Sequence, residues 1–211
     1  MINNYDYQSQ ANIQCFLEDS EYGERKMALY KLFDKFNQEN IHYGISCSFN
    51  LFIRGIVDEF HDFDLLVDSE DIPKIKKILE EEGANLIETG GNGYCESDVY
   101  MHFQFERVDI DIISGFRILT FGSSYLYVYN SNELDYINIE GKEIPLISME
   151  ALYILYSMME GWQARRRYKR LLIEDYLLRE KLRYPNILNV ALNSPIPGWI
   201  KQNIKSILLS K

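Results

Sequence analysis

Cysteines are few in this sequence, and their spacing suggests no shared role. The three residues, Cys15, Cys47 and Cys95, are far apart and odd in number. A disulfide framework needs paired cysteines, and a zinc site needs ligands a few residues apart, so the pattern argues against both. We therefore expect free thiols in a reducing compartment.

Long apolar runs are also missing. No stretch approaches the roughly 20 apolar residues that a helix needs to cross a bilayer. Residues 1–14 lack the basic start and apolar centre of a signal peptide. We expect a cytoplasmic protein without a membrane span, and its 211 residues are enough to bury a substantial core.

Positive charge is scarce as well. Lysine and arginine number 22 against 32 aspartates and glutamates, which gives a net charge of −10. A surface of this sign disfavours non-specific binding to nucleic acid and to anionic membranes. It suits a cationic substrate, although an ordinary acidic surface would explain the same charge.

The spacing of apolar residues predicts an α/β half followed by a helical half. We divide the chain into an α/β domain of residues 1–145, which includes an N-terminal helical arm, and a C-terminal helical domain of residues 146–211. Strands are predicted at residues 41–46, 62–67, 84–88, 99–105, 107–113, 125–129 and 136–139. Helices are predicted at residues 21–40, 49–56, 71–82, 148–160, 165–179, 186–192 and 199–209, and a glycine-rich loop at residues 89–93.

The segment that carries chemistry is the strand at residues 62–67. Asp62 and Asp64 are two residues apart and share one face of it, while Phe63 and Leu65 point to the other. Two adjacent carboxylates repel each other unless a cation lies between them, and a hard divalent cation prefers oxygen ligands. The alternative is that both aspartates lie on a solvent-exposed strand face.

A second acidic strand sharpens this interpretation. Asp109 and Asp111 alternate with isoleucines in residues 107–113, so they too share a face. Two such strands in one small domain predict a metal-dependent phosphate site.

Residues 45–55 (ISCSFNLFIRG) and 61–67 (HDFDLLV) resemble the DNA polymerase β-like nucleotidyltransferase superfamily. Within it, the chain is most similar to small antibiotic nucleotidyltransferases that act on lincosamides and aminoglycosides. The resemblance continues through residues 109–115 and 144–151, and covers about residues 22–180. It implies an α+β fold, in which a mixed β-sheet with flanking helices precedes a C-terminal helical bundle.

The resemblance also implies an activity. A nucleoside monophosphate would pass from a nucleoside triphosphate, ATP by expectation, to a hydroxyl of a small acceptor, with Mg²⁺ as cofactor. Asp62 and Asp64 would hold the metal, and a third carboxylate would complete the site and accept the hydroxyl proton. Asp111 is favoured because it precedes Ile-Ile-Ser-Gly, but Asp109 shares its strand face and stays a candidate metal ligand.

The nucleotide would contact the turn Ser46, Cys47 and Ser48, where the family has Gly-Gly or Gly-Ser. Ser48 can supply the hydroxyl, but Cys47 stands in a glycine position, and a residue with a Cβ tolerates positive φ poorly. Arg54, in the short helix, is a further candidate for a phosphate contact.

Residues 165–170 (RRRYKR) form the densest basic cluster. Relatives often have Arg-x-Lys there, so Lys169 is predicted to contact the triphosphate. Alternatively, the cluster is a solvated helix face that pairs with Glu174 and Asp175.

Two other functions remain open. The basic cluster would suit a toxin-like nucleotidyltransferase acting on RNA or protein, although the net charge disfavours nucleic acid. The Ser-Cys-Ser turn would suit a degenerate fold that binds without catalysis. Residues 94–100 are candidates for lining an acceptor pocket, while the acceptor itself, the preferred nucleotide and the oligomeric state are not determined by the sequence.

Overall fold

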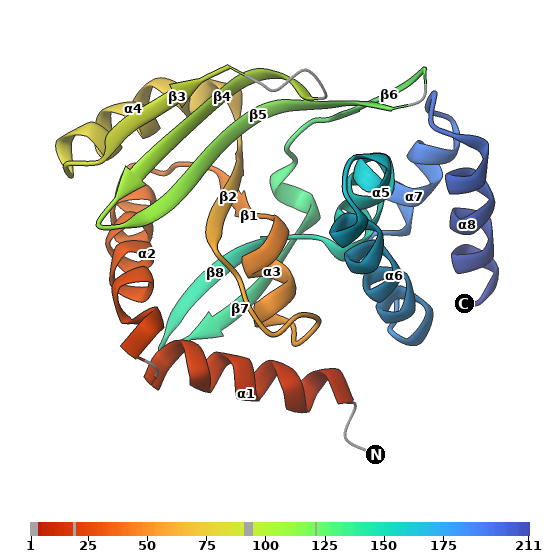
Figure 1. Ribbon diagram of the computed structural model, residues 1–211, viewed down its shortest axis with the longest axis horizontal. Helices are drawn as coiled ribbons and strands as arrows, with labels where there is room; N and C mark the ends of the chain where they lie inside the picture. Colours follow the sequence, from red (N-terminus) through yellow and green to blue (C-terminus); the bar gives the residue numbers. More distant parts are fainter. Residues whose placement is uncertain (1–3, 19, 91–94, 121) are drawn as a thin grey trace.

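A mixed β-sheet surrounded by helices forms the protein (Figure 1). The computed structural model describes residues 4–18, 20–90, 95–120 and 122–211. The strands are β1 Tyr43–Ile45, β2 Asp62–Val67, β3 Asn85–Thr89, β4 Cys95–Phe105, β5 Val108–Thr120, β6 Ser123–Tyr127, β7 Leu134–Ile139 and β8 Lys142–Ile147. The α-helices are α1 Asn4–Glu18, α2 Ser20–Gln38, α3 Cys47–Ile53, α4 Ile72–Glu81, α5 Met149–Met159, α6 Ala164–Arg179, α7 Pro185–Leu192 and α8 Gly198–Leu209.

The strand order is β3-β4-β5-β2-β1-β8-β7, and β6 pairs with the far part of β5. β2 is parallel to β5 and β1 is parallel to β8, while the other pairs are antiparallel. In the register of β2 with β5, Asp62 lies opposite Asp109 and Asp64 opposite Asp111. The two acidic strands are therefore direct neighbours.

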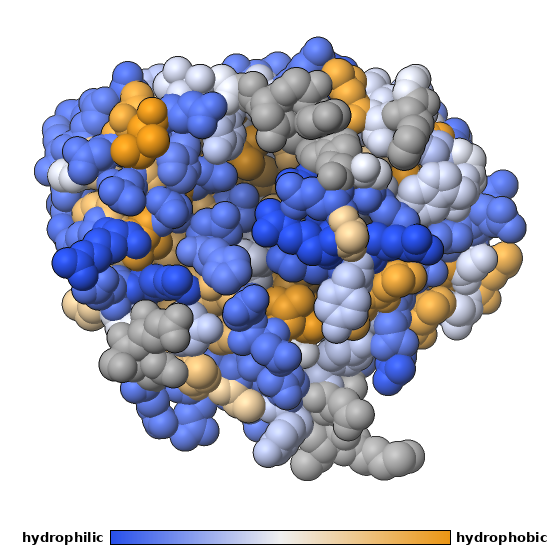
Figure 2. Space-filling model, in the orientation of Figure 1, coloured by the Kyte–Doolittle hydropathy of each residue, from blue (hydrophilic) through white to orange (hydrophobic). Residues whose placement is uncertain are grey.

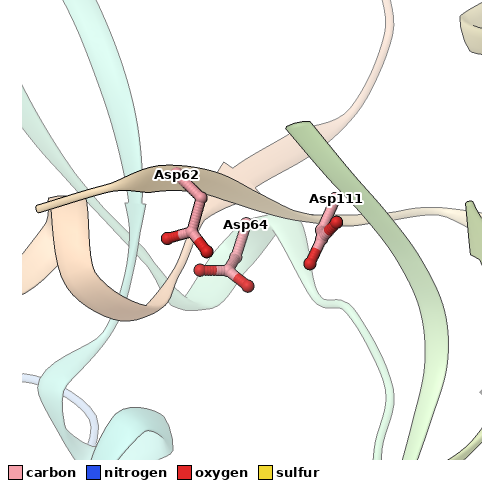
Figure 3. A group of neighbouring side chains, drawn as sticks. All are labelled: Asp62, Asp64 and Asp111. Atoms are coloured by element: carbon pink, nitrogen blue, oxygen red, sulfur yellow. The ribbon is translucent and has the colours of Figure 1, made fainter. Parts of the chain in front are cut away.

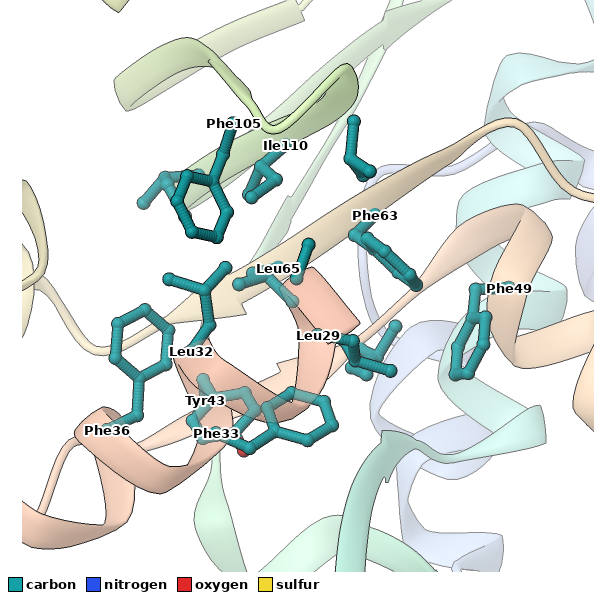
Figure 4. Close-up of a cluster of buried hydrophobic side chains, with 14 of the residues drawn as sticks. Leu29, Leu32, Phe33, Phe36, Tyr43, Phe49, Phe63, Leu65, Phe105 and Ile110 are labelled. Atoms are coloured by element: carbon teal, nitrogen blue, oxygen red, sulfur yellow. The ribbon is translucent and has the colours of Figure 1, made fainter. Parts of the chain in front are cut away.

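The two faces of the sheet bury different clusters of apolar side chains. On one face, Phe63, Leu65 and Ile110 pack against Leu29 and Phe33 of α2 (Figure 4). On the other, α5 is buried along its whole length and packs against β5 and against α6 and α7. Because side chains alternate along β2, Asp62 and Asp64 point toward the α5 side.

The predicted fold class is confirmed, as is the strand over residues 62–67. Helix α3 covers Cys47–Ile53, where the sequence predicted residues 49–56, and it ends before Gly55, whose φ of +71° only glycine adopts readily. β8 was missed, because residues 144–148 were interpreted as a lead into the next helix. The sheet ends at Ile147 and α5 begins at Met149, so the proposed domain boundary falls within β8. Residues 91–94, part of the predicted glycine loop and acceptor lining, lie outside the described residues.

The face of the molecule seen in Figure 2 is mostly hydrophilic, and a band of strongly hydrophilic side chains crosses its middle. No helix in the described part of the chain has the length and apolarity needed to cross a membrane.

A buried ion pair joins α3 to the far edge of the sheet. The Arg54 guanidinium lies 2.7 Å from the Asp135 carboxylate of β7, and these side chains are only 11% and 5% exposed. Arg183, before α7, contacts the other oxygen of Asp135 at 2.9 Å, but its side chain is 65% exposed. Asp135 therefore neutralises the buried charge of Arg54 with one oxygen and the exposed charge of Arg183 with the other.

We expect Asp135→Ala to lower the free energy of unfolding by about 3–5 kcal/mol, because it leaves the buried Arg54 charge without a carboxylate. Arg183→Ala serves as the matched control and should cost no more than about 1 kcal/mol, since its guanidinium is solvated. Urea denaturation of both variants measures the difference. Equal losses would contradict this account of the pair.

Candidate active site

Three carboxylates converge on one side of the sheet. Asp62 and Asp64 extend from β2, and Asp111 extends from β5 toward them (Figure 3). One oxygen of each lies within 4.8 Å of those of the others. Asp109 is not part of this group. Its half-exposed carboxylate lies 3.6 Å from His102 Nε2 instead. The geometry thus favours Asp111 over Asp109 as the third carboxylate.

Two of the three carboxyl groups have raised pKa values. Burial, followed by the charges of Asp62 and Asp111, raises the pKa of the Asp64 carboxyl well above its usual range. Burial also raises the pKa of Asp111, although hydrogen bonding to His102 opposes this shift. A divalent cation bound between the three oxygens would remove the repulsion and favour their ionised forms. The donor set, three carboxylate oxygens, therefore fits Mg²⁺.

The turn from β1 into α3 lies beside the carboxylates. The Ser46 N–H donates to the Asp64 carbonyl at 2.8 Å, and Ser48 Oγ donates to Asp62 Oδ1 at 3.0 Å. Cys47, between them, has a φ of +49°. An L-residue in this left-handed conformation costs about 1–2 kcal/mol. Cys47 therefore occupies a conformation that suits glycine, as its position in the family pattern predicted.

Asn50 holds this turn in place. Its fully buried side-chain amide donates to the carbonyls of Ile45 and Ile147 at 2.8 Å each. Its oxygen accepts from Arg54 Nε, also at 2.8 Å. The side chain thus joins α3 to the ends of β1 and β8.

The prediction that Arg54 contacts the nucleotide is not supported by its position. Its guanidinium extends away from the carboxylates toward Asp135, and it lines a separate cavity of about 240 Å³. Arg54 therefore links α3 to β7 and lies outside the lining of the cavity that holds the carboxylates.

A cavity of about 280 Å³ lies between the carboxylates and the C-terminal helices. The turn Ser46–Ser48 and the three aspartates form one wall. The opposite wall comes from α5 and α6, with Tyr156, Arg165, Arg166 and Lys169. The Lys169 ammonium lies 6.0 Å from the centre of the Tyr156 ring, within range of a cation–π interaction. Acidic and basic walls therefore face a common space, as a Mg²⁺-bound triphosphate requires.

The basic cluster of residues 165–170 divides into two groups. Arg167 and Arg170 pair with Glu160 at 3.4 and 2.6 Å, and Arg170 also pairs with Glu174. Lys169 lines the cavity together with Arg165 and Arg166. The cluster thus combines ion-paired residues with residues that line the cavity, and Asp175, a predicted partner, pairs with Arg179 instead.

The comparisons with known proteins agree with this geometry. The family model of aminoglycoside-2''-adenylyltransferase matches residues 28–172, well over half of the chain. The chain belongs to the aminoglycoside-2''-adenylyltransferase family. It is a nucleotidyltransferase by class, and the resemblance predicted from the sequence is confirmed. No curated protein sequence is significantly similar to it.

Solved structures share its fold. A candidate nucleotidyltransferase from Thermotoga maritima is 20% identical, with a TM-score of 0.57 over 72% of this chain and 94% of that one. ANT(2'')-Ia in complex with adenylyl-2''-tobramycin is 13% identical, with a TM-score of 0.51 over 71% and 87%. Lincomycin-bound LnuA, a lincosamide antibiotic adenylyltransferase, is 19% identical over 70% and 95%, with a lower TM-score of 0.49.

Several residues of the cavity were not found from the sequence. Arg165 and Arg166 were seen only as members of a charged cluster, and Tyr156 only as an apolar helix position. Glu88 of β3 lines the cavity, whereas His102 of β4 does not line it and contacts Asp111 across the strand pairing. Alternation along β4 could have placed Tyr100 and His102 on one face of the strand. It could not have shown that His102 lies opposite Asp111, because that depends on how β4 pairs with β5.

We expect Cys47→Gly to keep Mg²⁺-dependent ATP binding and to leave the free energy of unfolding within about 1 kcal/mol of wild type, because glycine accepts the positive φ at an entropic cost of similar size to the relieved strain. Cys47→Val should lower both the affinity for ATP and the free energy of unfolding, since a β-branched residue is a clear outlier at positive φ. Calorimetry and urea denaturation provide the two measurements. Cys47→Ala, which keeps the Cβ but removes the thiol, is the control, and a valine variant that behaves like alanine would contradict the argument.

Proposed function

We propose that this protein transfers AMP from ATP to a hydroxyl group of a small cationic acceptor, with Mg²⁺ as cofactor. The observation that carries the proposal is the cluster of Asp62, Asp64 and Asp111 at a cavity whose other wall is basic. Membership of an adenylyltransferase family supplies the reaction class.

Each carboxylate has a role in the proposed reaction. Asp62, Asp64 and Asp111 would hold Mg²⁺, which neutralises charge on the phosphates when bound. Asp111 accepts the proton of the acceptor hydroxyl as the new bond from its oxygen to the α-phosphorus forms. The bond from the α-phosphorus to the bridging oxygen breaks, and pyrophosphate leaves with the electron pair.

The triphosphate would lie between the turn Ser46–Ser48 and α6. Lys169, Arg165 and Arg166 lie on the side of the cavity away from the metal ligands, so they can contact phosphate oxygens that the metal leaves free. Arg167 and Arg170 are excluded from this role because they pair with Glu160.

The acceptor would enter beside β3 and β4. Glu88 of β3 and Ser97 and Tyr100 of β4 line the cavity there. Glu88 is not in the carboxylate cluster, so its charge is available to a substrate ammonium group, and the net charge of −10 also favours a cation. Aminoglycosides and lincosamides are therefore the acceptor classes to test first.

The two alternative functions, transfer to RNA and binding without catalysis, have less support. Two of the five basic residues at 165–170 pair with Glu160 and the other three line the cavity, so the cluster offers less basic charge to RNA than the sequence suggests. A degenerate fold was suggested by Cys47, but the described turn accommodates this residue at positive φ.

Transfer of label from α-labelled ATP to tobramycin, lincomycin and a panel of related compounds, under Mg²⁺ or Mn²⁺, tests the proposed function. Labelled product that requires the metal is the expected result. No product with any acceptor, together with no metal-dependent ATP binding, would refute the proposal.

For the metal site, we expect Asp64→Asn to abolish Mg²⁺-dependent ATP binding, because it removes the central carboxylate of the cluster. Asp109→Asn is the matched control, because it changes a neighbouring carboxylate on the same sheet face. It should bind ATP with the same Mg²⁺ dependence as the wild type. Titration calorimetry with and without Mg²⁺ measures both. Equal losses would show that Asp109 also belongs to the metal site.

For the triphosphate, Lys169→Ala should weaken ATP binding about 10-fold or more, the equivalent of one charged hydrogen bond. AMP binding should change little, because AMP lacks the β- and γ-phosphates. Arg167→Ala, on the same helix but paired with Glu160, is the control and should leave ATP binding unchanged. If AMP binding falls as much as ATP binding, Lys169 does not act on the triphosphate.

A further inference from the structure

His102 lies directly opposite Asp111 in the antiparallel pairing of β4 with β5. Its Nδ1 is 2.7 Å from Asp111 Oδ1, and the Tyr100 hydroxyl donates to the same oxygen at 3.2 Å. Both partners therefore contact one oxygen of the carboxylate and leave the other without a contact from β4.

These contacts have a defined direction. An ionised carboxylate only accepts hydrogen bonds, so the Nδ1 atom of His102 must carry the hydrogen. Both side chains are mostly buried, with 24% of His102 and 18% of Asp111 exposed, which limits competition from water. The contact from His102, at 2.7 Å, is shorter than the 3.2 Å contact from Tyr100 and is the stronger restraint.

We propose that His102 is a positioning residue for Asp111. By holding Oδ1, it sets the plane of the carboxylate that clusters with Asp62 and Asp64. This inference rests on the proposed function, since it assigns His102 a task in that reaction. Residues that orient ligand carboxylates typically contribute 10–100-fold to metal affinity or activity.

The fold does not need the His102 side chain to hold these strands together. The backbone pairing of β4 with β5 continues on both sides of His102, from Phe105 opposite Val108 to Cys95 opposite Ile118. His102 also points to the face with the carboxylates, whereas its neighbours Met101 and Phe103 are buried in the core on the other face. A role in orienting Asp111 accounts for a hydrogen bond that strand pairing does not require.

The test compares two amides that differ in where they place their N–H group. In His102→Asn the amide nitrogen stands near the position of Nδ1, so it can keep the bond to Asp111. In His102→Gln the amide nitrogen stands near the position of Nε2, so it cannot form the hydrogen bond to Asp111. The measurements are the affinity for Mn²⁺ in the presence of ATP, by calorimetry, and kcat and KM for transfer to the best acceptor of the panel.

We expect His102→Asn to stay within about 3-fold of wild type and His102→Gln to lose about 10–100-fold in Mn²⁺ affinity or kcat, with little change in KM for the acceptor. Melting temperatures of the two variants should agree, which separates positioning from a structural role. Equal function in the two variants, or losses that follow the melting temperature, would overturn the inference while leaving the proposed function intact. A wild-type protein that neither binds Mn²⁺ with ATP nor transfers label would refute both.

Discussion

The parallel pairing of β2 with β5 is the constraint on which the site depends. Its register places Asp64 opposite Asp111, and a slip of one residue would turn one set of carboxylates into the core. Phe63, Leu65 and Ile110 oppose such a slip because each would lose its buried contacts in the cluster beneath α2. The apolar face of the sheet therefore determines where the charged groups meet. Burying charges together is unfavourable without a counter-charge, so the fold holds a site that favours cation binding.

A polar framework beneath α3 supports this arrangement. Asn50 ties the helix to the carbonyl groups at the ends of two strands, and Arg54 continues the connection to Asp135 at the sheet edge. These bonds are buried, where losing one partner is costly. They explain how Cys47 can be kept in a conformation that is unfavourable for a residue with a Cβ. Local strain near the site is thus offset by hydrogen bonds formed several residues away.

The C-terminal helices supply the opposite charge. Helix α5 shares its apolar core with the sheet, so the position of α6 relative to the carboxylates is set by packing. Glu160 and Glu174 neutralise Arg170, while Lys169 lies at the cavity near Tyr156. An acidic protein therefore has a local basic wall on one side of the cavity and carboxylates on the other. The two halves of the sequence contribute opposite charges to one cleft.

Local patterns were sufficient to predict most of the elements and part of the site. Alternation identified the strand at residues 62–67 and the common face of Asp62 and Asp64, and helical spacing identified most of the helices. Other features were set only by packing between distant segments: the position of Asp109 outside the carboxylate cluster, the direction of Arg54, the hydrogen bond of His102 and the pairing of β8 with β1. Asp109 and Asp111 have the same local pattern, and only the path of β5 past β2 separates them. Side-chain periodicity assigns a residue to a face of its own strand, whereas its partners across the sheet depend on pairings between residues far apart in the chain.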